Sequence, residues 1–160
     1  MNDSLRVLIE QTQCAAKKRQ LDDAFALAEE AIAQYPTKKE VWDLRAFIRS
    51  LTGQYDLAIA DISTAINLDP RDPYLFFDRA RYHLGARQWQ AADNDSVRGL
   101  ELCEPHERET FHFLRAEALL QLGHKAEALV ELAEVDDDLR GWTFRFVRKE
   151  DLMAECQESS

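Results

Sequence analysis

A period of 34 residues runs through most of this 160-residue chain. The segment 31–36 returns as 65–70, and both segments begin with Ala-Ile and end with proline. The same offset relates Ala24, Ala58 and Ala92. Self-similarity at a fixed spacing of about 20 to 50 residues is the sequence signature of a stacked repeat array. The chain is therefore predicted to consist of similar small units, each of which packs against the next.

The apolar residues within these units are spaced as in α-helices. Ala24, Leu27, Ala28, Ala31 and Ile32 form a stripe at i, i+3, i+4, i+7 and i+8, which lies on one face of a helix. Five glycines and four prolines leave long uninterrupted segments, and no segment alternates for long enough to build a sheet. The sequence therefore predicts an all-α fold made of helix–turn–helix repeats.

Two helix starts can be predicted from local sequence. Thr37 stands three residues before Glu40, which is the spacing of a capping box. Asp72 precedes Pro73, which suits an N-cap followed by proline in the first helical position.

These features resemble the tetratricopeptide repeat (TPR), a helix–turn–helix unit of 34 residues. The pattern is fullest in the second unit, where the matching residues are Trp42, Ala46, Gly53, Tyr55, Ala58, Ile59, Ala65 and Pro70. The resemblance implies a right-handed TPR solenoid that forms a single domain over residues 1–160. Its expected parts are repeats at about 5–38, 39–72, 73–106 and 109–139, and a C-terminal cap at 140–156.

The resemblance also implies where a partner would bind. In the TPR family the first helix of each repeat lines a concave groove. Carried over by register, the candidate groove residues are Gln13, Lys17, Asp43, Phe47, Tyr74, Phe77, Arg81, Phe113 and Glu117. The aromatic members suit an apolar segment of a partner, and Arg81 can hold a carboxylate or offer a stacking plane. Each aromatic has a structural alternative, because an aromatic at helical spacing can equally belong to the core.

Some TPR proteins grip a C-terminal carboxylate with basic and asparagine side chains. The corresponding positions here are Ile9, Gln13, Leu44, Tyr74 and Asp78, and only Gln13 could act in this way. Capture of the acidic tail of a chaperone is therefore not expected.

Three arginines recur in one register of the repeats, as Arg45, Arg79 and Arg115. Their recurrence favours a structural role, in which the stems pack between helices and the charged ends meet Asp61 or Asp95.

The segment 140–149 departs from the repeat pattern, because it interleaves four basic residues with aromatics and contains no acid. Such a composition can bind single-stranded nucleic acid by stacking and phosphate contacts. The favoured interpretation is that Trp142, Phe144 and Val147 cover the open apolar end of the last repeat, since terminal repeats need a cap. A helix over about 143–156 is expected, although the alternating aromatics are also typical of a short strand.

Charge and hydropathy argue against several classes of protein. A net charge of −10 disfavours general binding to nucleic acid and to anionic membranes, which needs clustered lysine and arginine. No apolar run approaches the ~20 residues of a membrane span, and the N-terminus lacks the basic start and apolar segment of a signal peptide. We expect a cytoplasmic protein.

The residue types that usually carry chemistry are scattered along the chain. Cys14, Cys103 and Cys156 have the spacing of neither a disulfide framework nor a zinc site. The four histidines form no HExxH motif, and there is no glycine-rich phosphate loop or nucleophile elbow. The sequence therefore predicts no catalytic residue, no metal site, no cofactor and no enzyme activity.

The predicted function is non-catalytic binding of a protein or peptide segment in the groove. One alternative is a dedicated chaperone or neutralising, immunity-type partner of a single secreted or toxic protein, because small acidic proteins of this kind resemble type III secretion chaperones in size and charge. Another alternative, of a different class, is nucleic-acid binding through residues 140–149. A homodimer through the exposed end of the first repeat is a further possibility.

Overall fold

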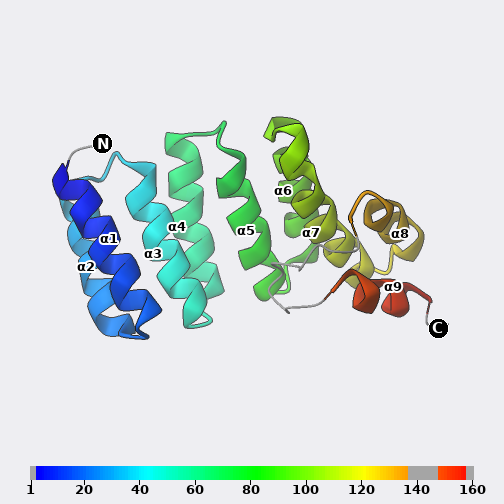
Figure 1. The fold of residues 1–160 in the computed structure, drawn as a ribbon, viewed down its shortest axis with the longest axis horizontal. Coiled ribbons are helices and arrows are strands. Elements are labelled where there is room, and N and C mark those ends of the chain that lie inside the picture. The colour runs from blue at the N-terminus through cyan, green and yellow to red at the C-terminus, as the bar shows by residue number, and fades with distance from the viewer. Residues whose placement is uncertain (1–2, 137–147, 158–160) are drawn as a thin grey trace. The chain divides into compact units, whose positions relative to one another are not determined.

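The computed structural model describes residues 3–136 and 148–157. Within these ranges the chain forms α-helices, one short 3-10 helix and turns, and no strand (Figure 1). The elements are α1 (Asp3–Lys17), α2 (Leu21–Gln34), α3 (Lys39–Leu51), α4 (Tyr55–Leu68), α5 (Pro73–Gly85), α6 (Trp89–Leu102), η1 (Pro105–Glu107), α7 (Arg108–Gln121), α8 (Lys125–Ala133) and α9 (Lys149–Gln157). The predicted all-α fold is confirmed.

The chain divides into two compact units, Met1–Arg71 and Asp72–Ser160. The first unit holds α1 to α4 and the second holds α5 to α9. Within each unit, consecutive helices up to α8 pack against one another, and α9 packs against both α7 and α8. The predicted single domain and the four repeat boundaries stay predictions.

Small side chains bring the helices of the first unit together. Ala24, Ala28 and Ala31 of α2 have no exposed surface. Ala24 and Ala28 pack in one cluster with Leu44 and Ile48 of α3. Because an alanine side chain is a single methyl group, α2 can approach its neighbours closely, and burial of each large aliphatic side chain contributes about 1.5–3 kcal/mol. The alanines of the sequence period are therefore contact residues between helices.

The second unit ends in a cluster that three helices share. Phe113 and Leu120 of α7, Leu132 of α8, and Leu152 and Cys156 of α9 are all buried in it. The short helix α9 thus covers apolar side chains at the end of the α7–α8 hairpin.

The predicted covering by Trp142, Phe144 and Val147 concerns residues outside the described ranges. The predicted helix over 143–156 overlaps α9, which the structure describes from Lys149 onward.

One ion pair recurs in three helix hairpins. An arginine on the first helix bonds an acid that lies 16 residues later on the second helix, with a nitrogen–oxygen distance of 2.7 Å each time. The three pairs are Arg45–Asp61, Arg79–Asp95 and Arg115–Glu131. The prediction for the arginines is confirmed for Arg45 and Arg79, whereas Arg115 meets Glu131 and Asp93.

The turns inside the four hairpins share one backbone conformation. Gly53 and Gly123 have φ angles of 74° and 83°, and Arg19 and Arg87 stand at the equivalent positions with φ angles of 62° and 60°. This left-handed region suits glycine, because a side chain there crowds the backbone. Two hairpins therefore turn at a favourable residue and two at an unfavourable one.

The two predicted helix starts have different outcomes. Asp72 is the N-cap of α5, where its side chain accepts a hydrogen bond from the Tyr74 amide at 2.9 Å. The capping box predicted at Thr37 is wrong, because α3 begins at Lys39 and its N-cap residue makes no side-chain cap. The Trp42 indole instead donates to the Pro36 carbonyl at 2.8 Å, which ties the incoming chain to the first turn of α3.

Candidate functional site

The predicted groove residues of the first unit lie on α1 and α3. Gln13 and Lys17 of α1 are exposed, and Asp43 of α3 is half-buried. Phe47 of α3 is 39% exposed, and so is Leu51, one helical turn further along the same face. We call Asp43, Phe47 and Leu51 the α3 surface.

The α3 surface stands on a helix that ion pairs hold in place. Asp61 of α4 accepts from Arg45 at 2.7 Å and from Arg49 at 2.6 Å, and both arginines belong to α3. On the other side of α3, large apolar side chains such as Ile48 are buried in the core. Phe47 and Leu51 are therefore exposed on a helix whose position is fixed by ion pairs and core packing.

The predicted groove residues of α5 share one face of that helix. Tyr74, Phe77 and Arg81 stand at i, i+3 and i+7 and form what we call the α5 surface. Tyr74 is 59% exposed, and its hydroxyl donates to a carboxylate oxygen of Glu107 in η1. This hydrogen bond raises the pKa of Tyr74 and lowers the pKa of Glu107.

Arg81 and Phe77 are held in a fixed arrangement on α5. The guanidinium of Arg81 lies 5.6 Å from the centre of the Phe77 ring and bonds Asp78 at 2.9 Å. The Phe77 ring meets Phe111 edge-on at 5.8 Å between centroids. Burial raises the pKa of the Asp78 carboxyl, and Arg81 opposes that rise. The Nε of Arg81 is buried without a hydrogen-bond partner, so a partner carboxylate could reach only the terminal nitrogens of the guanidinium.

Two predicted groove residues are in the core. Phe113 and Glu117 of α7 are only 2% and 1% exposed. Phe113 belongs to the cluster that Leu152 and Cys156 of α9 complete. Phe113 is therefore a core residue, as its structural alternative had it, and Glu117, predicted to line the groove, is buried as well, so neither is accessible to a partner in this structure. The repeat register alone could not reveal this, because α9 lies more than thirty residues later in the chain.

Leu51 is an exposed apolar residue that the repeat register missed. Its spacing of one helical turn from Phe47 was the available signal, since residues at i and i+4 are neighbours on a helix surface. It extends the apolar part of the α3 surface toward the C-terminal end of α3.

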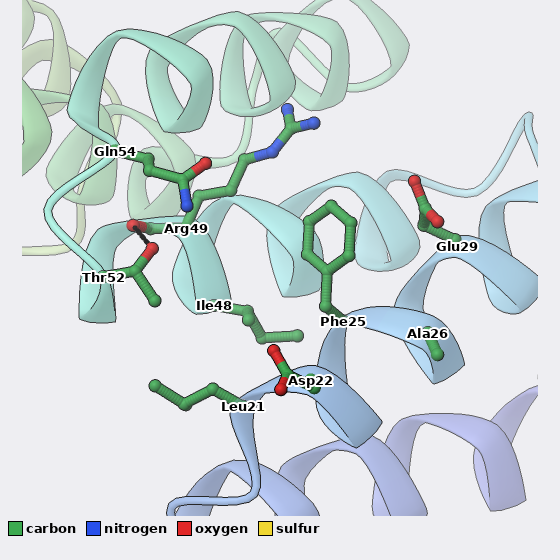
Figure 2. A pocket seen from close by; sticks show the side chains of 9 residues that line it. All are labelled: Leu21, Asp22, Phe25, Ala26, Glu29, Ile48, Arg49, Thr52 and Gln54. Atoms are coloured by element: carbon green, nitrogen blue, oxygen red, sulfur yellow. Dashed lines mark hydrogen bonds between the residues drawn. The ribbon is translucent and has the colours of Figure 1, made fainter.

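A pocket of about 440 Å³ opens between α2 and α3, on a side that the sequence did not indicate (Figure 2). Leu21, Phe25 and Ile48 supply its apolar lining, and Asp22 and Glu29 stand among its polar residues. The guanidinium of Arg49, another lining residue, lies 5.7 Å from the centre of the Phe25 ring. Because Arg49 is already paired with Asp61, the pocket offers apolar surface with acids at its edge rather than a free cation.

Two smaller hollows lie at other places. One hollow, of about 400 Å³, lies between the first half of α1 and the end of α2, and its lining includes Val7 and Gln34. The other, of about 390 Å³, is polar and includes His106 and His112 beside Glu109. No group of three or more histidine, cysteine, aspartate or glutamate side chains in the described ranges could hold a metal ion. In those same ranges, every helix is too short or too polar to cross a bilayer.

Comparison by sequence identifies no relative. No model of a known protein family matches the chain, and no curated protein matches it.

Comparison by structure gives clear matches at low identity. A MamA protein superposes with a TM-score of 0.73 at 13% identity, covering 84% of this chain and 72% of MamA. MamA of MSR-1 gives a TM-score of 0.70 at 18% identity, over 84% of this chain and 78% of MamA. The type III secretion chaperone SycD of Yersinia enterocolitica, in complex with a peptide of the translocator YopD, gives 0.69 at 20% identity, over 78% of this chain and 97% of SycD. At these identities the matches concern the fold, and the chain has the TPR-type helical-repeat fold that it shares with MamA and SycD.

Proposed function

We propose that this chain is a TPR protein of about four repeats that binds a segment of another protein through the first helices of its repeats, without catalysing a reaction. One observation carries the proposal: Phe47 and Leu51 of α3 and Tyr74 of α5 are exposed on helices whose other large apolar residues are mostly buried. Single exposed apolar residues are common on any protein surface. Here Phe47 and Tyr74 fall at the register that the repeat pattern assigns to partner binding, and Leu51 is one helical turn from Phe47.

The chemistry of the two surfaces suits a peptide with apolar side chains and at least one acid. Phe47 and Leu51 offer apolar contact, and Arg81 offers terminal guanidinium nitrogens beside the Phe77 ring. Aromatic and arginine side chains are the residue types that most often dominate binding energy at interfaces. Because each surface lies on a helix that packs against its neighbours within its own unit, most of the ordering entropy falls on the partner segment.

The dedicated chaperone is the second candidate function, and one observation favours it. SycD, which matches this chain over 97% of its own length, is a secretion chaperone in complex with a peptide of its translocator. A single partner in one-to-one proportion would distinguish a dedicated chaperone from an adaptor that assembles several proteins. Nucleic-acid binding through residues 140–149 gains no support, because that proposal rests mainly on residues outside the described ranges.

The proposal can be tested with the full chain as bait in lysate of its own source. Three baits are compared: the natural chain, a Phe47→Glu, Tyr74→Glu variant, and a Leu57→Glu control on α4. Leu57 is 49% exposed, so the control introduces the same change at an exposed apolar position outside the two surfaces. A specific partner should bind the natural chain and the control equally, and the double variant at least about tenfold more weakly, since loss of a central contact costs more than about 1.4 kcal/mol.

Circular dichroism of the three baits shows whether the helices are intact. Equal capture by the double variant would refute binding at the α3 and α5 surfaces. Loss of capture by the Leu57→Glu control alone would instead assign recognition to α4.

A further inference from the structure

The pocket of about 440 Å³ between α2 and α3, which we call the α2–α3 pocket, combines an apolar lining with acids at its edge (Figure 2). Ile48 of α3 is only 1% exposed, and the half-buried side chains of Leu21 and Phe25 come from α2. Asp22 and Glu29 of α2 are both exposed and line the same pocket. Sites that hold ligands in proteins have volumes of about 300–1,000 Å³, so the α2–α3 pocket has room for a large side chain.

The ionised groups around the α2–α3 pocket carry one net negative charge. Asp61 pairs with Arg49 at 2.6 Å and with Arg45 at 2.7 Å. Arg45 also lies 3.8 Å from Glu29. With Asp22, three carboxylates face two guanidinium groups, and three minus two leaves one negative charge. Since no ion pair of Asp22 occurs among the described residues, the pocket is complementary to an incoming cation.

Arg49 offers little to an incoming acid, because groups of the same unit already engage it. Its Nη1 donates to the Asp61 carboxylate at 2.6 Å and to the Leu57 carbonyl at 3.2 Å. Its guanidinium lies 5.7 Å from the centre of the Phe25 ring, and its Nε is buried. An acidic segment would therefore gain little from Arg49 and would be repelled by the exposed acids of the pocket.

Two residues that give the α2–α3 pocket its character belong to the first hairpin alone. The period of 34 residues carries Phe25 onto Ile59 and Glu29 onto Ser63. The neighbouring Ala24, by contrast, recurs as alanine in the next two units. An aromatic and an acid at these positions are therefore not requirements of the repeat fold, which favours a role in binding.

The two exposed acids are spaced so that an extended chain can reach both. Asp22 and Glu29 are seven residues apart on α2, which is about 10.5 Å along the helix axis and nearly two full turns. In an extended segment, residues i and i+4 lie about 13 Å apart, and the side chains at i, i+2 and i+4 point to one side. Basic side chains at i and i+4 can therefore meet the two acids while the side chain at i+2 enters the pocket.

We propose that the α2–α3 pocket is a second docking site, and that it binds an extended segment of a partner protein with basic residues at i and i+4 and a large apolar residue at i+2. The apolar side chain packs on Phe25 and Ile48, and the basic side chains meet Asp22 and Glu29. Apolar burial supplies most of the affinity, whereas exposed ion pairs are weak and select the charge of the partner. The site goes beyond the proposed partner binding, because no residue of the α3 surface or the α5 surface takes part and either site can fail without the other.

Peptide titration of the full, isotope-labelled chain tests the proposal, with the NMR shifts of the backbone amides as the readout. The probe is an acetylated and amidated peptide that contains Lys-Ser-Phe-Ser-Lys, and it should shift the amides of α2 and of the C-terminal half of α3 in a saturable way. A peptide with alanine in place of phenylalanine should bind at least about tenfold more weakly, because it cannot bury the ring. A peptide that contains Glu-Ser-Phe-Ser-Glu should leave these amides unshifted.

A matched pair of charge variants tests the role of the two acids. The first variant is Asp22→Lys, Glu29→Lys. The control is Asp23→Lys, Glu30→Lys, which makes the same change in net charge one position further along α2, at exposed residues that do not line the pocket. At 0.15 M salt, where charges are screened beyond about 8 Å, the first variant should bind the probe at least about tenfold more weakly than the natural chain, and the control within about threefold. Circular dichroism shows whether both variants are folded.

Each of several outcomes would overturn the proposal. Equal weakening by the two variants would show that net charge, and not the pocket, attracts the probe. Binding of the acidic peptide at the same amides would assign recognition to Arg49. Shifts on α5 in place of α2 would move the probe to the α5 surface.

Two further outcomes would assign the α2–α3 pocket to a different occupant. Phenethylamine that saturates the same amides as tightly as the probe would make the pocket a site for a small amine. Shifts of these amides on dilution of the chain alone would show that a second copy of the chain occupies it.

Discussion

At the scale of single residues, the turns of the four hairpins show what the repeat requires of its backbone. Arg19, Gly53, Arg87 and Gly123 all adopt positive φ angles, although only two of them are glycine. The left-handed conformation costs a non-glycine residue about 1–2 kcal/mol. Glycine avoids that cost but loses about 0.5–1 kcal/mol through its freedom in the unfolded chain. The balance favours glycine at each turn.

We predict that Arg87→Gly raises the free energy of unfolding by about 0.5–1 kcal/mol, because the gain in the turn exceeds the loss of chain entropy. Urea unfolding followed by circular dichroism measures the change. The control is Arg87→Ala, which removes the side chain but keeps the unfavourable conformation, and it should not stabilise the protein. A stabilised Arg87→Ala variant would show that the arginine side chain, and not the backbone, sets the cost.

Gly99 of α6 is a residue whose lack of a side chain allows close packing. A Cβ at this position of α6 would overlap the ring of Phe111, a fully buried side chain of α7. We predict that Gly99→Ala lowers the free energy of unfolding by about 1–3 kcal/mol, because overpacking exceeds the gain of about 1 kcal/mol in helix propensity. Urea unfolding gives the value. The second change Phe111→Leu should recover part of the loss in the Gly99→Ala background, and no recovery would place the strain elsewhere.

At the scale of secondary-structure elements, the recurrent ion pairs hold each first helix against its second helix. Asp61 is buried and accepts from both Arg45 and Arg49. A buried charge left without its partner is strongly destabilising, even where the intact pair adds little to stability. The two pairs with Asp61 therefore fix the position of α3 against α4 more than they add to the free energy of folding.

We predict that Asp61→Asn lowers the free energy of unfolding by about 3 kcal/mol, since it removes the buried carboxylate that pairs with two largely buried guanidinium groups and leaves only the more distant Glu29, at 3.8 Å, beside Arg45. Chemical unfolding of the purified chain measures the loss. The control is Glu101→Gln, which breaks the exposed Arg98–Glu101 pair and should cost less than about 1 kcal/mol. Equal losses in the two variants would contradict a special role for the pair on α3.

A second contact between elements predicts a dependence on pH. Lys39 at the start of α3 bonds Asp69 after α4 at 2.6 Å, and this lowers the pKa of Asp69 below its ordinary value of 3.8. A depressed pKa stabilises the folded chain above the ordinary value, and the contribution is lost as pH falls through the folded pKa. The difference in unfolding free energy between the natural chain and Asp69→Asn should therefore shrink as pH falls from about 6 to about 3.

The control for this prediction is the same comparison in a Lys39→Met background. Without the ammonium group, the pH dependence of the Asp69→Asn difference should become much smaller. A difference that stays constant with pH in the natural chain would show that Lys39 does not shift the titration of Asp69.

At the scale of the whole molecule, the chain offers an interaction surface on each of its two units. The α3 surface belongs to the first unit and the α5 surface to the second. Repeat proteins bind extended segments along successive repeats. We predict that Phe47→Glu and Tyr74→Glu, tested separately, each weaken capture of the same partner. If only one of the two variants loses capture, recognition is confined to the unit that carries that residue. The bait experiment, repeated with each single variant, distinguishes these outcomes.

Much of the fold followed from features that are local in the sequence. The period, the alanine stripe and the Asp72-Pro73 start concern residues within one or two helices, and all describe the structure correctly. The partners of Arg45 and Arg79 were also predictable, because a pair inside one hairpin depends on the spacing between two adjacent helices, whereas Glu131 and Asp93, which Arg115 meets, were not predicted. The capping box at Thr37 failed for the opposite reason: Trp42 fixes the chain before α3 through the Pro36 carbonyl, which the capping rule does not consider.

The sequence by itself determined the helical class, the repeat spacing and which residues recur at each register, because these depend on helical periodicity and on contacts between adjacent helices. Only the tertiary structure decided which members of a register are accessible. Phe47 and Phe113 are both aromatic groove candidates, yet Phe47 is exposed and Phe113 is buried in the cluster that α9 completes. Exposure depends on what later parts of the chain cover, and no spacing within a repeat contains that information.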